Sequence, residues 1–171
     1  MGLIPQHHRH VWIIRHGKST EGMLGQTDYD RLLNGRGEKD GLSMQIWYSQ
    51  HPQPAQWVWI STAARAKRSA SYVVKGFNAT GIDDPNLYLA NAHELMSCLQ
   101  TTPSEILNVA IVAHNPGLTH LANILSNRHV TDNLVTFGSV LLGTDLDWIN
   151  LAPNCAEFIQ LQTPAKIHST A

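Results

Sequence analysis

Two arginines and two histidines stand at or just beyond the ends of apolar runs that are typical of buried strands. The four residues are Arg15, His16, Arg65 and His114. An arginine guanidinium binds phosphate oxygens through paired N–H donors. A neutral histidine ring can attack phosphorus, and a protonated ring can stabilise negative charge. These residue types therefore predict a site for a phosphoryl group.

Hydrophobic patterning predicts the elements that must position these residues. Runs suited to strands buried on both faces lie at 11–14, 57–60 and 109–113. Helices are expected over 36–50, 62–77, 91–101 and 116–127. Later strands are expected over 139–145 and 156–162, and a short one near Leu87–Leu89, with loops at 51–56 and 78–86. Strands that alternate with helices predict an α/β fold, a three-layer α/β/α sandwich with a mostly parallel central sheet.

Such a sheet would gather the four residues at one place. Ligands of open α/β sheets bind beyond the carboxyl ends of the strands, where all three apolar runs end. Gly17 permits a close approach of the backbone to a ligand. The segment Asn115-Pro116-Gly117 opens a helix whose first amides can help to hold an anion. The expected site is therefore an anion pocket at this sheet edge.

The same residues lie in blocks that resemble those of a known family. Arg15-His16-Gly17-Lys18-Ser19 resembles the R-H-G-x-S/T signature of the histidine phosphatase superfamily, the phosphoglycerate mutase-like proteins. The segment from Ser61 to Ala70 resembles the S-x-x-x-R-A-x-x-T-A motif, and His114-Asn115-Pro116-Gly117 resembles the second histidine block. The resemblance runs from about residue 10 to 162. The short chain and the H-N-P-G-L sequence are most similar to the SixA-type branch, which acts on phosphohistidine.

The resemblance implies a role for each site residue, with no metal and no cofactor. His16 would be the nucleophile that accepts the phosphoryl group, and a backbone carbonyl near Gly17 or Lys18 is expected to hold its other ring nitrogen. The phosphate and the charge of the transition state would be stabilised by Arg15, Arg65 and His114. Further phosphate or substrate contacts are implied for Ser19 and Asn115.

A general acid is the part of the site that the sequence leaves open. Hydrolysis of a phosphate ester expels an alkoxide, which ester-cleaving relatives protonate with a carboxylic acid. Glu94 is the best-placed candidate, but the spacing Asn91-x-x-Glu94 is also that of a helix capping box. Weaker candidates are Glu21, Asp28 and Asp30. Imidazole leaves far more readily than an alkoxide, so a phosphohistidine substrate does not require such an acid.

These features together predict a metal-independent phosphatase that forms a phosphohistidine intermediate. Its expected partner is a signalling protein of the histidine phosphotransfer type, phosphorylated on histidine. One alternative is a phosphatase or mutase of small phosphate monoesters with Glu94 as the acid. An alternative of another class is a phosphate-binding regulatory module with little turnover.

Length, charge and composition bear on the number of domains, the binding partners and the cellular compartment. The 171 residues suit a single domain over 1–171 with its core at about 10–162. A net charge of -1 argues against nucleic-acid binding, and the longest apolar runs are too short for a membrane helix. Cys98 and Cys155 lie far apart, as in proteins of a reducing compartment, although one long-range disulfide would also fit. With a polar segment before residue 10, we expect a cytoplasmic protein. The run His7-His8-Arg9-His10 is either a polar lead-in to the first strand or a metal-binding stretch.

Overall fold

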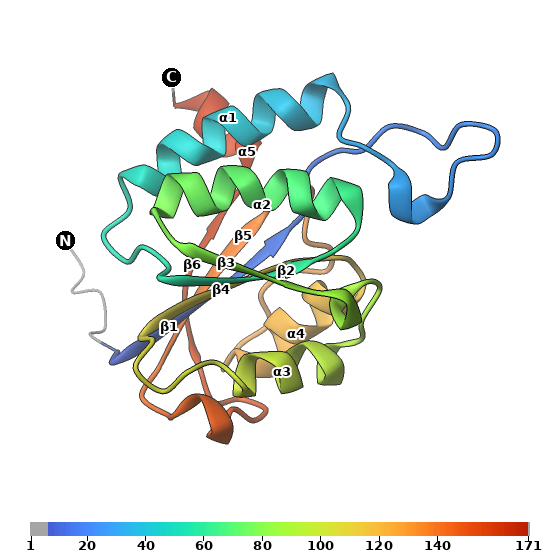
Figure 1. Ribbon diagram of the computed structural model, residues 1–171. Helices are drawn as coiled ribbons and strands as arrows, with labels where there is room; N and C mark the ends of the chain where they lie inside the picture. The colour runs from blue at the N-terminus through green and yellow to red at the C-terminus, as the bar shows by residue number, and fades with distance from the viewer. Residues whose placement is uncertain (1–6, 171) are drawn as a thin grey trace.

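One six-stranded sheet with the order β3-β2-β4-β1-β5-β6 forms the centre of the structure, a computed structural model that describes residues 7–170 (Figure 1). The strands are β1 (Arg9–Arg15), β2 (Trp57–Ser61), β3 (Thr80–Asp84), β4 (Asn108–Ala113), β5 (Ser139–Thr144) and β6 (Glu157–Gln162). Only the pairings that involve β5 are antiparallel, so β5 alone runs against the other strands. The polar segment before residue 10 lies partly outside the described residues.

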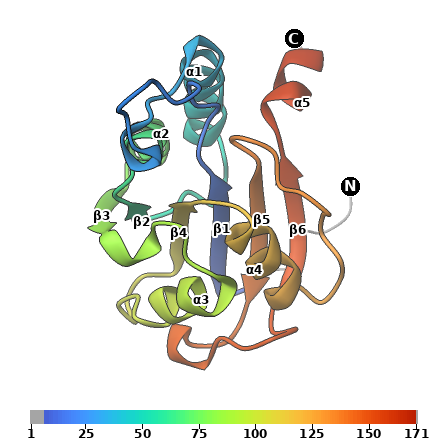
Figure 2. The same ribbon diagram turned by 90° about the vertical axis from the view of Figure 1, so that its right-hand side faces the viewer.

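Helices cover both faces of this sheet and complete three layers (Figure 2). One face carries α1 (Gly35–Ser49) and α2 (Ala64–Phe77), with α5 (Pro164–Ser169) packed against α1. The other face carries α3 (Ala92–Gln100) and α4 (Gly117–Leu125). The predicted α/β fold with a mostly parallel sheet is confirmed.

Strand β1 shows why its sequence is a continuous apolar run. Val11 and Ile13 pack into the core beneath α3 and α4, whereas Trp12 and Ile14 pack into the core beneath α1 and α2. All four side chains are fully buried. Each contributes about 1.5–3 kcal/mol through removal of apolar surface from water. The strand that ends in Arg15 is therefore anchored in both hydrophobic cores.

The segment between α2 and α3 corrects two predictions. Residues Thr80–Asp84, expected to be a loop, form edge strand β3, which pairs with β2 in parallel. Most of its side chains are exposed, so no apolar run marks it in the sequence. The expected strand near Leu87–Leu89 is instead a 3-10 turn, η2 (Pro85–Leu87), in which Leu87 is buried. Helix α5 was not predicted.

The remaining sequence features have local explanations. Arg9 and His10 lie inside β1 rather than ahead of it; Arg9 pairs with Asp147 at 2.9 Å, and His10 Nδ1 lies 3.0 Å from Asn108 Oδ1. Over residues 7–170, no three His, Cys, Asp or Glu side chains form a group that could hold a metal ion. Both cysteines are free thiols. In this same part of the chain no helix is long and apolar enough to span a bilayer.

Candidate active site

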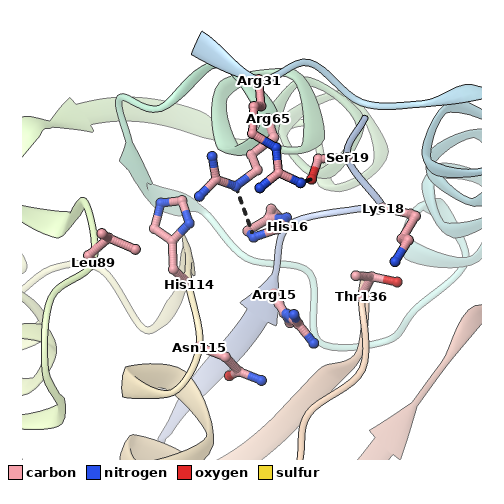
Figure 3. A pocket seen from close by; sticks show the side chains of 10 residues that line it. All are labelled: Arg15, His16, Lys18, Ser19, Arg31, Arg65, Leu89, His114, Asn115 and Thr136. Carbon is pink, nitrogen blue, oxygen red and sulfur yellow. Dashed lines mark hydrogen bonds between the residues drawn. The ribbon is translucent and has the colours of Figure 1, made fainter. Parts of the chain in front are cut away.

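The four predicted residues meet in one pocket beyond the carboxyl ends of β1, β2 and β4 (Figure 3). The parallel register sets Ile14 and Ile60 both opposite Val112, so the three strands end at the same level. The cavity has a volume of about 240 Å³. It is lined by Arg15, His16, Lys18, Ser19, Arg31, Arg65, Leu89, His114, Asn115 and Thr136.

His16 presents one ring nitrogen to the cavity and has the other one fixed. Its Nδ1–H donates to the carbonyl of Gly17 at 2.8 Å, and its Nε2 accepts from Arg65 Nε–H at 3.3 Å. The expected backbone carbonyl is therefore present at Gly17. Burial and the charges of Arg65 and Arg15 lower the pKa of His16 to about 4. The ring is neutral at pH 7, with the lone pair of Nε2 available to an electrophile.

Gly17 connects the R-H-G block to the segment from Ser61 to Ala70. A Cβ at this position would lie 2.4 Å from the ring of Phe137, so only glycine fits beside His16. The Gly17 amide donates to Ser69 Oγ at 2.8 Å, and the Ser69 hydroxyl donates to the Arg65 carbonyl at 2.7 Å. One buried hydroxyl therefore fixes the relative positions of His16 and Arg65.

His114 stands on the opposite wall, with its ring centroid 5.0 Å from that of His16. Its Nε2 is hydrogen-bonded to Ser61 Oγ at 2.7 Å, and its buried Nδ1 has no partner among residues 7–170. Burial, then the neighbouring His16 and Arg65, lower the pKa of His114 to about 3. A phosphoryl dianion beside this ring would favour its protonated form, so His114 can become a hydrogen-bond donor when substrate enters.

The charge of the cavity wall is strongly positive. Besides the two predicted arginines, Lys18 and Arg31 line it, and no carboxylate of residues 7–170 does. Arg31 donates through Nη2 to Ser19 Oγ at 2.8 Å. Lys18 belongs to the first sequence block, which could have indicated it. Arg31 lies in the segment Asp30-Arg31-x-Leu33, which resembles the family's D-x-R-x-L stretch and could have indicated it. Thr136 comes from the loop before β5, which shows no hydrophobic periodicity.

Three further predicted residues have different positions. Ser19 and Asn115 line the cavity, but the Asn115 amide is engaged with the 133–134 loop, donating to the Leu134 carbonyl at 2.9 Å. Glu94 does not line it. Its carboxylate accepts from the Asn91 amide at 2.8 Å, and the Asn91 side chain accepts from the Glu94 amide at 3.0 Å. The capping box that its spacing suggested is therefore present at the start of α3.

Solved structures share this architecture over nearly the whole chain. A SixA protein of Nakamurella multipartitia, assigned as a phosphohistidine phosphatase, has a TM-score of 0.81 and 21% identity, covering 91% of this chain and 96% of that one. The protein histidine phosphatase SixA in complex with tungstate has a TM-score of 0.78 and 19% identity, covering 92% and 99%. The chain has the histidine phosphatase fold.

Other proteins with the histidine phosphatase fold are less similar. A mycobacterial glucosyl-3-phosphoglycerate phosphatase has a TM-score of 0.62 and 15% identity, covering 91% of this chain and 97% of that one. No protein-family model and no curated protein sequence matches the chain. In this histidine phosphatase fold, the pocket of His16 lies at the carboxyl edge of the sheet, where the R-H-G block ends β1.

Proposed function

We propose that this protein is a phosphatase that takes the phosphoryl group of phosphohistidine onto His16 and then transfers it to water. The observation that carries the proposal is the state of His16: Nδ1 is held by the Gly17 carbonyl while Nε2 faces Arg65 in a cationic cavity. A neutral imidazole with a fixed tautomer is a competent nucleophile toward phosphorus.

In the first step the Nε2 lone pair forms a bond to phosphorus while the bond from phosphorus to the substrate imidazole breaks. The departing imidazole keeps the bonding electrons and takes a proton from solvent. Arg15, Arg65 and protonated His114 stabilise the charge on the transferring oxygens. In the second step water attacks phosphorus, the bond to Nε2 breaks, and inorganic phosphate leaves with His16 regenerated.

The cavity favours a substrate with a good leaving group. Within the described part of the chain its wall holds no carboxylate, and the side chain of Glu94 is engaged in capping α3. An imidazole can leave without a strong acid, whereas an alkoxide needs one. The two solved SixA structures, named for phosphohistidine or protein histidine phosphatases, support the same class of substrate.

The rim of the pocket favours a protein as the carrier of that phosphohistidine. Leu89, on the wall of the cavity, is 58% exposed, and Val135, next to Thr136, is 45% exposed. Leu89 is therefore an exposed apolar side chain beside the polar site, which a macromolecular partner would cover. The free thiols of Cys98 and Cys155 fit a reducing compartment such as the cytoplasm.

Phosphorus NMR with three donors tests the proposal. The protein is incubated with a phosphohistidine-containing phosphotransfer domain, with phosphoimidazole and with 3-phosphoglycerate. We expect inorganic phosphate from the first two and little from the third. Rapid release from 3-phosphoglycerate alone would favour an ester phosphatase, and binding of phosphate without turnover of any donor would favour a regulatory module.

A further inference from the structure

The loop after β1 brings a carboxylate to Arg65 from outside the cavity. Asp28, in the 3-10 turn η1 (Asp28–Asp30), accepts from Arg65 Nη1 through its backbone carbonyl at 2.6 Å and from Nη2 through Oδ2 at 2.9 Å. One residue therefore occupies both terminal nitrogens of the guanidinium. Each terminal nitrogen keeps a second N–H, and the Nε–H of Arg65 is directed at His16 Nε2.

Asp28 is itself held from two further sides. The Tyr88 hydroxyl donates to Oδ2 at 2.6 Å, and Arg31 Nη1 lies 3.1 Å from Oδ1. The Tyr88 ring meets the rings of Tyr29 and His114 edge-on, with centroids 5.0 and 5.5 Å away. The carboxylate is thus fixed by groups from three separate segments, although its side chain is 46% exposed.

We propose that Asp28 is a positioning residue for phosphoryl transfer, which holds the Arg65 guanidinium so that its Nε–H points at a phosphoryl group on His16. The inference rests on the proposed function. Asp28 contacts Arg65 from the side of η1 and is not among the residues that line the cavity. A donor that is already oriented needs no reorganisation in the transition state, which is how such groups accelerate a reaction.

The charge state of Asp28 separates this role from that of a general acid. The hydrogen bond from Tyr88, with those from Arg65 and Arg31, lowers the pKa of Asp28 to about 2. The group is therefore ionised at pH 7 and has no proton to give to a leaving group. Its carboxylate instead offsets part of the positive charge of the Arg65 guanidinium.

The test compares Asp28→Ala with Asp30→Ala. Asp30 lies in the same turn, but its carboxylate accepts from Thr27 Oγ1 at 2.6 Å and does not contact Arg65. For both variants, kcat and KM are measured with phosphoimidazole, and orthovanadate affinity is measured by inhibition and by calorimetry. The ¹⁵N-resolved Nε–H signal of Arg65, assigned by its loss in Arg65→Gln, reports guanidinium order directly. Both substitutions are then repeated in the Arg65→Gln background.

In Asp28→Ala we expect about a tenfold fall in kcat/KM, carried mainly by kcat, the factor that corresponds to one hydrogen bond of ordinary strength. Vanadate affinity should fall similarly, the Arg65 Nε–H signal should broaden, and Asp30→Ala should stay within about twofold of the parent. In the Arg65→Gln background, loss of Asp28 should add less than about twofold. Tyr88→Phe, which keeps the ring, should show a smaller loss in the same direction.

Two results would overturn the inference. Unchanged or tighter vanadate binding in Asp28→Ala would mean that the carboxylate is inert or competes with the oxyanion. A full Asp28 effect in the Arg65→Gln background would mean that it does not act through Arg65. Absence of phosphohistidine turnover in the parent would instead refute the proposed function, while the Arg65 signal and vanadate binding would still test Asp28.

Discussion

The Nε–H of Arg65 donates to Nε2 of His16 at 3.3 Å, although the two residues are 49 positions apart in the chain. The contact joins the end of β1 to the first turn of α2, and it marks where a phosphoryl group would lie. A group bonded to His16 Nε2 would receive the same Nε–H through one of its oxygens. The arrangement therefore predicts separate effects for substitutions of His16, of Arg65 and of the residues that contact them.

Replacement of Arg65 by lysine should be damaging even though it keeps the positive charge. A lysine has no Nε–H and cannot reproduce the two terminal contacts with Asp28. Loss of one charge-assisted hydrogen bond costs about 1.5–3 kcal/mol, so the rate with phosphoimidazole should fall roughly ten- to a hundredfold. Steady-state kinetics measures this. A rate within about twofold of the parent would mean that Arg65 does not bind the phosphoryl group.

Ser69→Ala should destabilise the protein, because the variant leaves the Gly17 amide without its acceptor at a buried position. Such an unpaired group costs about 1–3 kcal/mol of unfolding free energy. Urea unfolding measures the loss. The control is Ser71→Ala, an exposed serine in the same helix, which should change stability by no more than about 0.5 kcal/mol. Equal effects of the two substitutions would contradict the stabilising role of the hydrogen bond between the Gly17 amide and Ser69.

Glu94→Gln should leave the phosphatase nearly intact. Glutamine can accept from the Asn91 amide as glutamate does, so stability should change by about 1 kcal/mol or less. The rate with phosphoimidazole should stay within about twofold. Parallel assays with phosphoimidazole and 3-phosphoglycerate check this. A folded variant that selectively loses roughly a hundredfold in ester hydrolysis would make Glu94 the acid and an ester the substrate.

Stability should fall as the solution is acidified below about pH 6.5. Burial lowers the folded-state pKa to about 4 for His16 and about 3 for His114, and also lowers it for His10 and His51. Below about pH 6.5 the unfolded chain binds protons at these histidines that the folded chain does not, so acid favours unfolding. The effect of Asp28, whose pKa is about 2, begins only below about pH 4.

Calorimetric Tm values between pH 8 and pH 5 measure this dependence. His114→Gln removes one buried histidine and should flatten the fall, whereas His93→Gln, on the exposed face of α3, should not. A Tm that is constant or rises between pH 6.5 and pH 5 would contradict the neutral state of these side chains.

The sequence was sufficient for the parts of the site that lie on regular elements. Arg15 ends β1, and His16 and His114 directly follow β1 and β4. Both strands are buried on both faces, and such strands leave an apolar run that ends abruptly. The Asn91 and Glu94 capping box was also predictable, because its contacts span only three residues. Hydrophobic runs and capping hydrogen bonds both depend only on residues that are close together in the sequence.

Contacts made by loops and edges were not predictable in the same way. Strand β3 has a mostly exposed surface, so its residues show no buried pattern although they pair with β2. Asp28 was only a weak candidate for a general acid. Its contact with Arg65 depends on the path of the loop between β1 and α1, which no periodic pattern reports.

Phosphoryl transfer to His16 is the central claim, and trapping of the intermediate tests it most directly. The protein is mixed with ³²P-labelled phosphoimidazole, quenched in alkali within milliseconds to seconds, and digested for peptide mass spectrometry. We predict an acid-labile, base-stable phosphoryl group on His16, and its absence together with turnover in a folded His16→Ala protein. His120→Ala, an exposed histidine of α4, should retain both. Substantial turnover by folded His16→Ala, or label on another residue, would contradict the account.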